Sequence, residues 1–218
     1  LTVIAIIGIL AAIIIPTIGK VRQTAQAARC VSVMHSLYMG FAAFANDNKQ
    51  HYMLPYNNSS GIDQKWFCHV APYLNYEIKG NWTDLENALT RSNSPLKCPV
   101  SDRARLQSEG WAYGWISFAM PQLHRNAYTG TLPIPGSAPG VAVTDIKNPA
   151  SSLLVVETHA EAVFRDWRKG NEAGVVQGMD YPHNNKCNAL FADGHVKAVS
   201  GMDAQANWPV WYDKCVGD

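Results

Sequence analysis

The sequence lacks the local motifs by which many enzymes are identified. It has no Gly-rich phosphate-binding loop, no nucleophile elbow and no His-Glu-x-x-His metal motif. Charged residues make up only 16% of its 218 residues, and 18 Lys and Arg against 17 Asp and Glu give a net charge of +1. This balance provides no basic surface of the kind that nucleic-acid binding requires. We therefore expect neither an enzyme nor a nucleic-acid-binding protein.

Cysteine is also scarce, and no two of the five cysteines form a Cys-x-x-Cys pair. That absence disfavours a zinc site and excludes a c-type haem. In an oxidising compartment, four cysteines would form two disulfides, although spacing alone does not fix their connectivity. Cys30 lies in a helical segment and is the natural unpaired residue. We expect bridges between Cys68 and Cys98 and between Cys187 and Cys215.

Charge is absent from the first part of the chain. The run from Leu1 to Ile15 is entirely apolar or uncharged and stops at Pro16. A helix that is apolar on every side needs lipid or other copies of itself as its surroundings. The run is shorter than the roughly 20 residues that span a bilayer, so we expect further apolar residues to precede it. It indicates a membrane anchor, softened between Gly8 and Pro16, where both residues weaken a helix.

Beyond Pro16 the pattern becomes amphipathic, with small or apolar residues at steps of three and four. These positions are Val21, Ala25, Ala28, Val31, Met34, Leu37, Tyr38, Phe41 and Phe44. The pattern predicts one helix over residues 1–52, with an anchor over 1–18 and an amphipathic half over 19–52. The amphipathic half would pack on a β-rich head over 53–218 through Val31, Met34, Tyr38 and Phe41. The expected fold class is α+β, a long N-terminal helix packed on a small antiparallel sheet with long loops.

The clearest local signal in the head is Asp193-Gly194 between two strand-like runs. Asp-Gly favours a two-residue hairpin turn in which both residues have positive φ. We expect residues 187–192 to pair with residues 195–199 across it. In this interpretation Asp193 is a turn residue.

Three other interpretations of the head remain open. Asp180 and Asp193 are candidate ligands for a structural Ca²⁺, although no Asp-x-Asp-x-Asp loop is present. A metal-dependent hydrolase would use His183, Asp193 and His195. A membrane-anchored, carbohydrate-binding module would use an aromatic platform, although aromatic residues more often serve as core or interface anchors. The platform would comprise Trp111, Tyr113, Trp115, Trp208, Trp211 and Tyr212.

Both ends of the chain resemble a known family. The run from Ile4 to Pro16, continued by Ala28-Arg-Cys-Val-Ser-Val-Met-His-Ser-Leu37, is similar to the N-terminal helix of bacterial type IV pilin-like proteins, including the major pseudopilins of type II secretion. His183, nine residues and Asp193-Gly194 match the H-x9-DG signature of one prepilin-like branch. Lys97-Cys98-Pro99 and residues 191–196 also resemble that branch, whereas residues 55–180 match only in scattered places.

The resemblance implies a structural subunit that polymerises with copies of itself into a helical filament. Its precursor would lie in the inner membrane with the head in the periplasm, and assembly machinery would extract it into a surface pilus or a periplasmic pseudopilus. The prepilin cleavage site, methylated residue and assembly glutamate of the family would precede Leu1. No cofactor is implied. The residues expected in the filament core are Ile4, Ile7, Gly8, Leu10, Ile14, Ile15 and Pro16.

Overall fold

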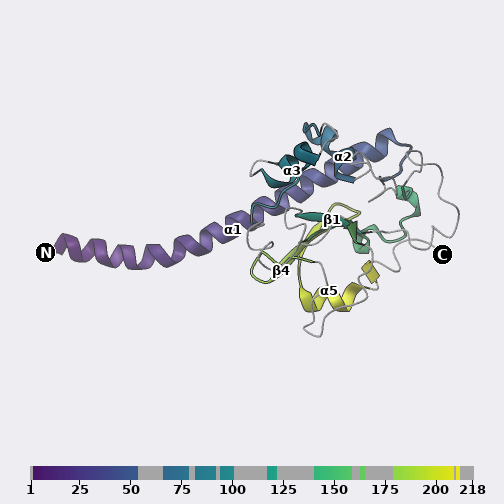
Figure 1. Cartoon of the computed structure of the whole chain (residues 1–218). Coiled ribbons are helices and arrows are strands. Elements are labelled where there is room, and N and C mark those ends of the chain that lie inside the picture. Colours follow the sequence, from purple (N-terminus) through teal and green to yellow (C-terminus); the bar gives the residue numbers. More distant parts are fainter. Residues whose placement is uncertain are drawn as a thin grey trace.

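A computed structural model describes residues 2–53, 66–78, 82–91, 94–100, 117–121, 140–158, 163–164, 179–208 and 210–211. Its dominant element is helix α1, Thr2–Asp47, whose first half projects from the remainder of the molecule (Figure 1). Pro16 lies inside this helix, and the predicted soft segment from Gly8 to Pro16 is helical. One turn of the helix there is supported by the Thr17 hydroxyl, which donates to the Ile14 carbonyl at 2.8 Å.

Helix α1 ends a few residues before the predicted boundary. Lys49 and Gln50 adopt positive φ angles of 55° and 60°, which an α-helix cannot continue. The Gln50 amide donates to the Ala45 carbonyl at 2.8 Å and closes the last turn. The chain then joins a distant segment, because the Tyr52 amide donates to the Val141 carbonyl at 2.9 Å.

Short helices pack along the second half of α1. They are α2, Trp66–Val70, and the 3-10 helix η2, Ala71–Leu74. Helix α3, Trp82–Thr90, lies on the same side of α1 (Figure 1). Gly40 allows the close approach, since a Cβ at that position would lie 2.6 Å from the Val70 Cγ2 atom. The Phe41 ring stacks on Trp66 with a centroid separation of 5.6 Å.

A five-stranded sheet lies on the other side of α1. The strand order is β3-β1-β2-β4-β5, and only the β1–β3 pair is parallel. A long N-terminal helix on a small, mainly antiparallel sheet confirms the predicted α+β fold class. The strands are β1, Phe118–Pro121, β2, Leu153–Glu157, β3, Val163–Phe164, β4, Lys186–Phe191, and β5, Val196–Ser200; the remaining elements are 3-10 helices η3, Val143–Asp145, and η4, Pro149–Ser151, and helix α5, Gly201–Trp208.

The sheet separates two cores. The core between the sheet and α1, here called the helix-side core, includes Met34, Leu37, Phe41, Leu154, Val155 and Leu190. The core on the opposite face, here called the outer core, is covered by α5 and includes Leu153, Val156, Cys187, Phe191, Val199, Ala204 and Trp211 (Figure 1). The head predicted over 53–218 therefore shares its core with the second half of α1.

An irregularity in β2 sets which core each of its residues enters. The register with β4 shifts between Leu153 and Val155, as in a β-bulge. As a result the consecutive residues Leu154 and Val155 both join the helix-side core, whereas Leu153 and Val156 join the outer core. Alternation resumes after the bulge, so Glu157 faces α1.

The predicted hairpin forms, but its turn differs from the expectation. β4 and β5 pair antiparallel with Leu190 opposite Val196, and the Phe191 amide donates to the His195 carbonyl at 3.0 Å. Among the described turn residues only Gly194 has a positive φ, 90°, and its amide donates to the Phe191 carbonyl at 2.9 Å. The turn is therefore a three-residue loop closed by a glycine in the left-handed region. Asp193 accepts the His195 amide at 3.1 Å without adopting positive φ itself.

We predict that Gly194→Ala destabilises the head by about 1–3 kcal/mol, through backbone strain and overlap with a packed ring. An added Cβ would lie 2.6 Å from Cε1 of Tyr38 on α1. Thermal or denaturant unfolding of the full chain in detergent measures the effect. Gly19→Ala is the matched control, because nothing lies within 4 Å of its added Cβ. Equal stability of the two variants would contradict the prediction.

Candidate functional site

The first candidate site is the projecting half of α1. The large apolar side chains that the structure describes between Val3 and Val21 are 49–71% exposed. The helix is also long and apolar enough to cross a membrane. Nothing in the most apolar stretch of this helix is buried inside the molecule. Gly8 and Pro16 lie within it, as do the expected filament-core residues Ile7, Leu10, Ile14 and Ile15. The backbone of Ile4 belongs to the same helix.

The second half of α1 enters the head. Met34 and Phe41 are completely buried, and Tyr38 packs on the helix-side core. Val31, the fourth predicted packing residue, is only partly buried and is not among the residues of that core. Cys30 is the first buried side chain along the described part of α1. Burial of one face of α1 in the head therefore begins at this cysteine.

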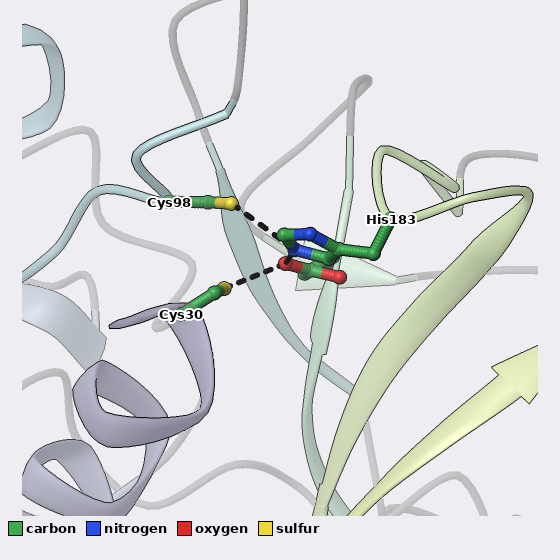
Figure 2. Close-up of side chains that lie close together, drawn as sticks. Cys30, Cys98 and His183 are labelled. Atoms are coloured by element: carbon green, nitrogen blue, oxygen red, sulfur yellow. Dashed lines mark hydrogen bonds and ion pairs between the residues drawn. The ribbon is translucent and has the colours of Figure 1, made fainter. Parts of the chain in front are cut away.

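Cys30 belongs to the second candidate site, a cluster that it forms with Cys98, Glu157 and His183. One ligand atom from each of these four residues lies within 4.8 Å of every other. Figure 2 shows Cys98 directed toward the His183 ring and Cys30 directed toward the carboxylate beside that ring, from separate segments of the chain. All four side chains are buried, and those of His183 and Glu157 are only 6% and 1% exposed. We call this group the four-residue cluster.

Glu157 is the centre of the cluster's hydrogen bonds. Its Oε1 atom accepts from the Cys30 thiol at 2.7 Å and from His183 Nε2 at 2.8 Å (Figure 2). Its Oε2 atom accepts from the backbone amide of Asn188 at 2.6 Å. Cys98 Sγ lies 3.5 Å from the same His183 Nε2 atom. A buried carboxylate requires such partners, since an uncompensated charge in the core is costly.

Local sequence places each member of the cluster. The bulge in β2 directs Glu157 toward α1. Asn184 and Asn185 both adopt positive φ, 52° and 59°, in a tight turn that holds His183 immediately before β4. Cys98 follows a turn stabilised by Ser94, whose hydroxyl contacts the Ala88 carbonyl and accepts the Leu96 amide at 3.1 Å.

The cluster alters the acidity of its members. Burial would lower the pKa of His183, but hydrogen bonds with Cys98 and Glu157 outweigh it and raise this pKa to about 10. The interaction with Cys30 lowers the pKa of the Cys98 thiol, although burial opposes that change. The raised pKa of His183 favours a protonated imidazole at its contact with Glu157 Oε1. The chemistry available is therefore cation binding or charge pairing by two sulfurs, one nitrogen and one carboxylate.

The structure does not contain the predicted Cys68–Cys98 disulfide. Cys187 is also not in a disulfide, and its predicted partner Cys215 lies outside the described residues. Cys98 is directed at Cys30 and His183, whereas Cys68 lies on α2 at the margin of the helix-side core. Cys187 points into the outer core, where burial raises the pKa of its thiol well above the ordinary value. Cys30, expected to be the isolated cysteine, is the one beside Cys98.

The residues proposed for a calcium or hydrolase site do not assemble. His195 Nδ1 pairs with Asp193 Oδ1 at 2.6 Å on the surface, whereas His183 turns inward to Glu157. Asp180 is buried, and its Oδ1 atom accepts the Tyr181 amide at 3.0 Å. Within the described ranges, Asp180 and Asp193 belong to no group of three or more clustered His, Cys, Asp or Glu side chains.

Of the six residues proposed for an aromatic platform, Trp211 is the one whose side chain the structure describes, and it gives the platform no support. Trp211 is buried in the outer core and meets Phe191 at a ring-centroid distance of 5.5 Å. Trp208 ends α5. The other predicted members lie outside the described residues: Trp111, Tyr113, Trp115 and Tyr212.

Sequence reasoning missed the four-residue cluster, and Glu157 was not among the predicted site residues at all. The absence of Cys-x-x-Cys spacing argued against a metal, but the four ligands come from four separate segments. The available signal was indirect. Cys30, Cys98 and His183 each lie in one of the three short motifs that resemble the pilin-like branch.

We predict that Cys68 and Cys187 are alkylated without reductant once the protein is unfolded, because neither is in a disulfide. In the native protein the partly exposed Cys68 reacts first, and Cys187 reacts only as the head opens. Peptide mass mapping after alkylation measures both results. A peptide linked through Cys68–Cys98 or Cys187–Cys215 would show that the original disulfide prediction was right.

Comparison with protein-family models finds no match to this chain, and comparisons with curated proteins and with solved structures also find none. The long apolar helix and small antiparallel sheet are compatible with a pilin-like architecture.

Proposed function

We propose that this protein is the structural subunit of a type IV pilin-like filament. The observation that carries the proposal is the first half of α1, which extends from a folded head with its apolar side chains 49–71% exposed (Figure 1). Water is an unfavourable solvent for such a surface. Lipid surrounds it before assembly, and the same half of other subunits surrounds it in the filament.

The head fixes the direction in which the apolar half projects. Leu37 and Phe41 are completely buried on the same continuous helix that carries Ile14 and Ile15. The projecting half therefore continues the helix that is packed in the head, and this packing sets the direction in which it leaves the head. Identical subunits that contact one another through two different surfaces build open helical polymers when the contacts do not close into a ring. This geometry gives a filament with the spines inside and the heads outside.

The surface of the projecting half also suits close helix packing. Gly8 has open space around its Cα, and Ala12 lies on the same face one turn later. Small residues spaced by four let helix backbones approach closely in lipid, where packing rather than hydrophobicity drives association. Transfer from lipid into the filament core is nearly neutral in apolar burial, so packing and contacts between heads supply the specificity. An assembly machinery supplies the work of extraction.

This proposal places the precursor in the inner membrane, with its head in the periplasm. The filament then forms either a surface pilus or a periplasmic pseudopilus, as the sequence resemblance implies. The surface of the filament consists of the head.

Substituting Ile15 by Asp should abolish filaments, because a carboxylate in the packed spine has no partner and costs several kcal/mol to bury. Ile15 is 71% exposed in the monomer, so the head stays folded. Electron microscopy and immunoblotting of the sheared surface fraction and of a periplasmic extract measure assembly. Thermal unfolding of the full chain in detergent measures the fold.

The matched control is Met202→Asp, since Met202 is 75% exposed but lies on α5, away from the spine. This variant should retain filaments. Intact filaments in the Ile15→Asp variant would overturn the proposed function. The full chain is used because a head beginning at residue 52 would lack Cys30, Met34, Leu37 and Phe41 of its core.

A further inference from the structure

We propose that Cys30, Cys98, Glu157 and His183 bind one structural Zn²⁺ ion that fastens α1 to the head. Two thiolate sulfurs, an imidazole nitrogen and a carboxylate oxygen form a complete four-ligand set for zinc. All four ligands come from the protein and all are buried. Structural zinc sites are closed in this way, whereas catalytic sites keep a position open to water.

The distances suit a tetrahedral ion with little rearrangement. Zinc bonds of about 2.0–2.3 Å place tetrahedral ligand atoms roughly 3.3–3.8 Å apart. The pairs around Glu157 Oε1 are closer than this, at 2.7 and 2.8 Å, and Cys98 Sγ to His183 Nε2 is 3.5 Å. Every pair of ligand atoms lies within 4.8 Å. Shifts of about 1 Å or less in side chains therefore bring all four onto a tetrahedron.

The donor set discriminates among metals. Calcium and magnesium prefer six or more oxygen ligands, and this cluster offers one carboxylate. Iron–sulfur clusters use cysteine at nearly every position. Mixed sulfur and nitrogen ligands in a tetrahedral arrangement favour zinc. The carboxylate replaces the third cysteine or second histidine of the common zinc sets.

The hydrogen atoms available in this cluster are too few to satisfy every hydrogen-bond acceptor in it. His183 Nε2 carries at most one hydrogen, yet it lies against both Glu157 Oε1 and Cys98 Sγ. Binding of Zn²⁺ at the centre displaces that hydrogen and the thiol protons of Cys30 and Cys98. Three protons leave to solvent, four metal–ligand bonds form, and no electron is transferred.

A second layer of hydrogen bonds supports the ligands. The backbone amide of Asn188 donates to Glu157 Oε2 at 2.6 Å, and Glu157 Oε1 is directed at the Cys30 sulfur and the His183 nitrogen. The backbone amide of Val100 interacts with the Cys98 sulfur. Such partners orient metal ligands and are part of functioning metal sites.

The ion would connect four segments at one point: α1, the segment after α3, strand β2 and the turn before β4. Cys30, the ligand from α1, is the first buried residue along the described part of this helix, so the site lies where the projecting half joins the head. A metal there fixes the helix to the head at the base of the projection. The site depends only on the fold, so its test and the filament test have independent outcomes.

The full chain, expressed with zinc and purified in detergent with a phosphine reductant, should contain one zinc per chain by elemental mass spectrometry. Replacement by Co²⁺ should give a thiolate-to-metal charge-transfer band and the intense visible bands of a tetrahedral ion. Removing zinc with a chelator should lower the unfolding temperature. These measurements use wild-type protein and do not depend on a variant that folds poorly.

The test pairs each ligand variant with a control outside the cluster. Loss of a residue that only supports a metal ligand typically lowers metal affinity by roughly 10–100-fold. Cys98→Ser and His183→Gln remove a ligand itself, so each should lower the zinc affinity by more than this. Cys68→Ser and His195→Gln should retain one zinc and the cobalt spectrum. Absence of bound zinc in wild type would overturn the proposal, as would equal zinc in Cys98→Ser and Cys68→Ser. A Cys30–Cys98 disulfide that persists in zinc-saturated protein would also overturn it.

Discussion

The structure depends on one constraint: a single helix must satisfy two different surroundings. Before Cys30, no described side chain of α1 is buried, and from Cys30 onward its inner face forms the middle of the head. Met34, Leu37 and Phe41 are covered by the sheet on one side and by short helices on the other. Burying those side chains contributes about 1.5–3 kcal/mol each, which anchors the helix against tilting. The projecting half inherits its direction from this burial.

The second constraint is the buried carboxylate of Glu157. A core carboxylate is costly unless several donors surround it, and here the donors come from α1, from β4 and from the turn before β4. The β2 bulge is what makes this possible. With regular alternation from Leu153, Glu157 would enter the outer core beside Cys187 and Phe191 instead of facing α1. One extra residue in one strand therefore determines where the polar centre of the head lies.

The features that could be predicted from the sequence are those that local periodicity determines. The helix with an exposed apolar half and a buried amphipathic half, the α+β class and the pairing of β4 with β5 all follow from patterns within about 15 residues of one another. The four-residue cluster was beyond such reasoning, because its members are joined only by tertiary folding. The bulge in particular leaves no local signature in Leu153-Leu-Val-Val-Glu157, a uniformly apolar strand before its last residue. The Asn184-Asn185 turn did carry a signal, since two residues tolerant of positive φ stand together.

A disulfide would be a poorer solution at this junction than a metal. A Cys30–Cys98 bond would tie α1 to the segment after α3, but it would remove the thiol that donates to Glu157 and leave the carboxylate with fewer partners. It would not connect β2 or the turn before β4. A divalent ion would offset two of the three negative charges of the carboxylate and the two thiolates, and it would hold all four segments. If the chain assembles into the proposed filament, a helix pulled from one end would load the head at its point of entry, and Cys30 marks that point. Resistance to unfolding at that point is greatest when the connection joins α1 to several strands and turns of the head rather than to a single segment.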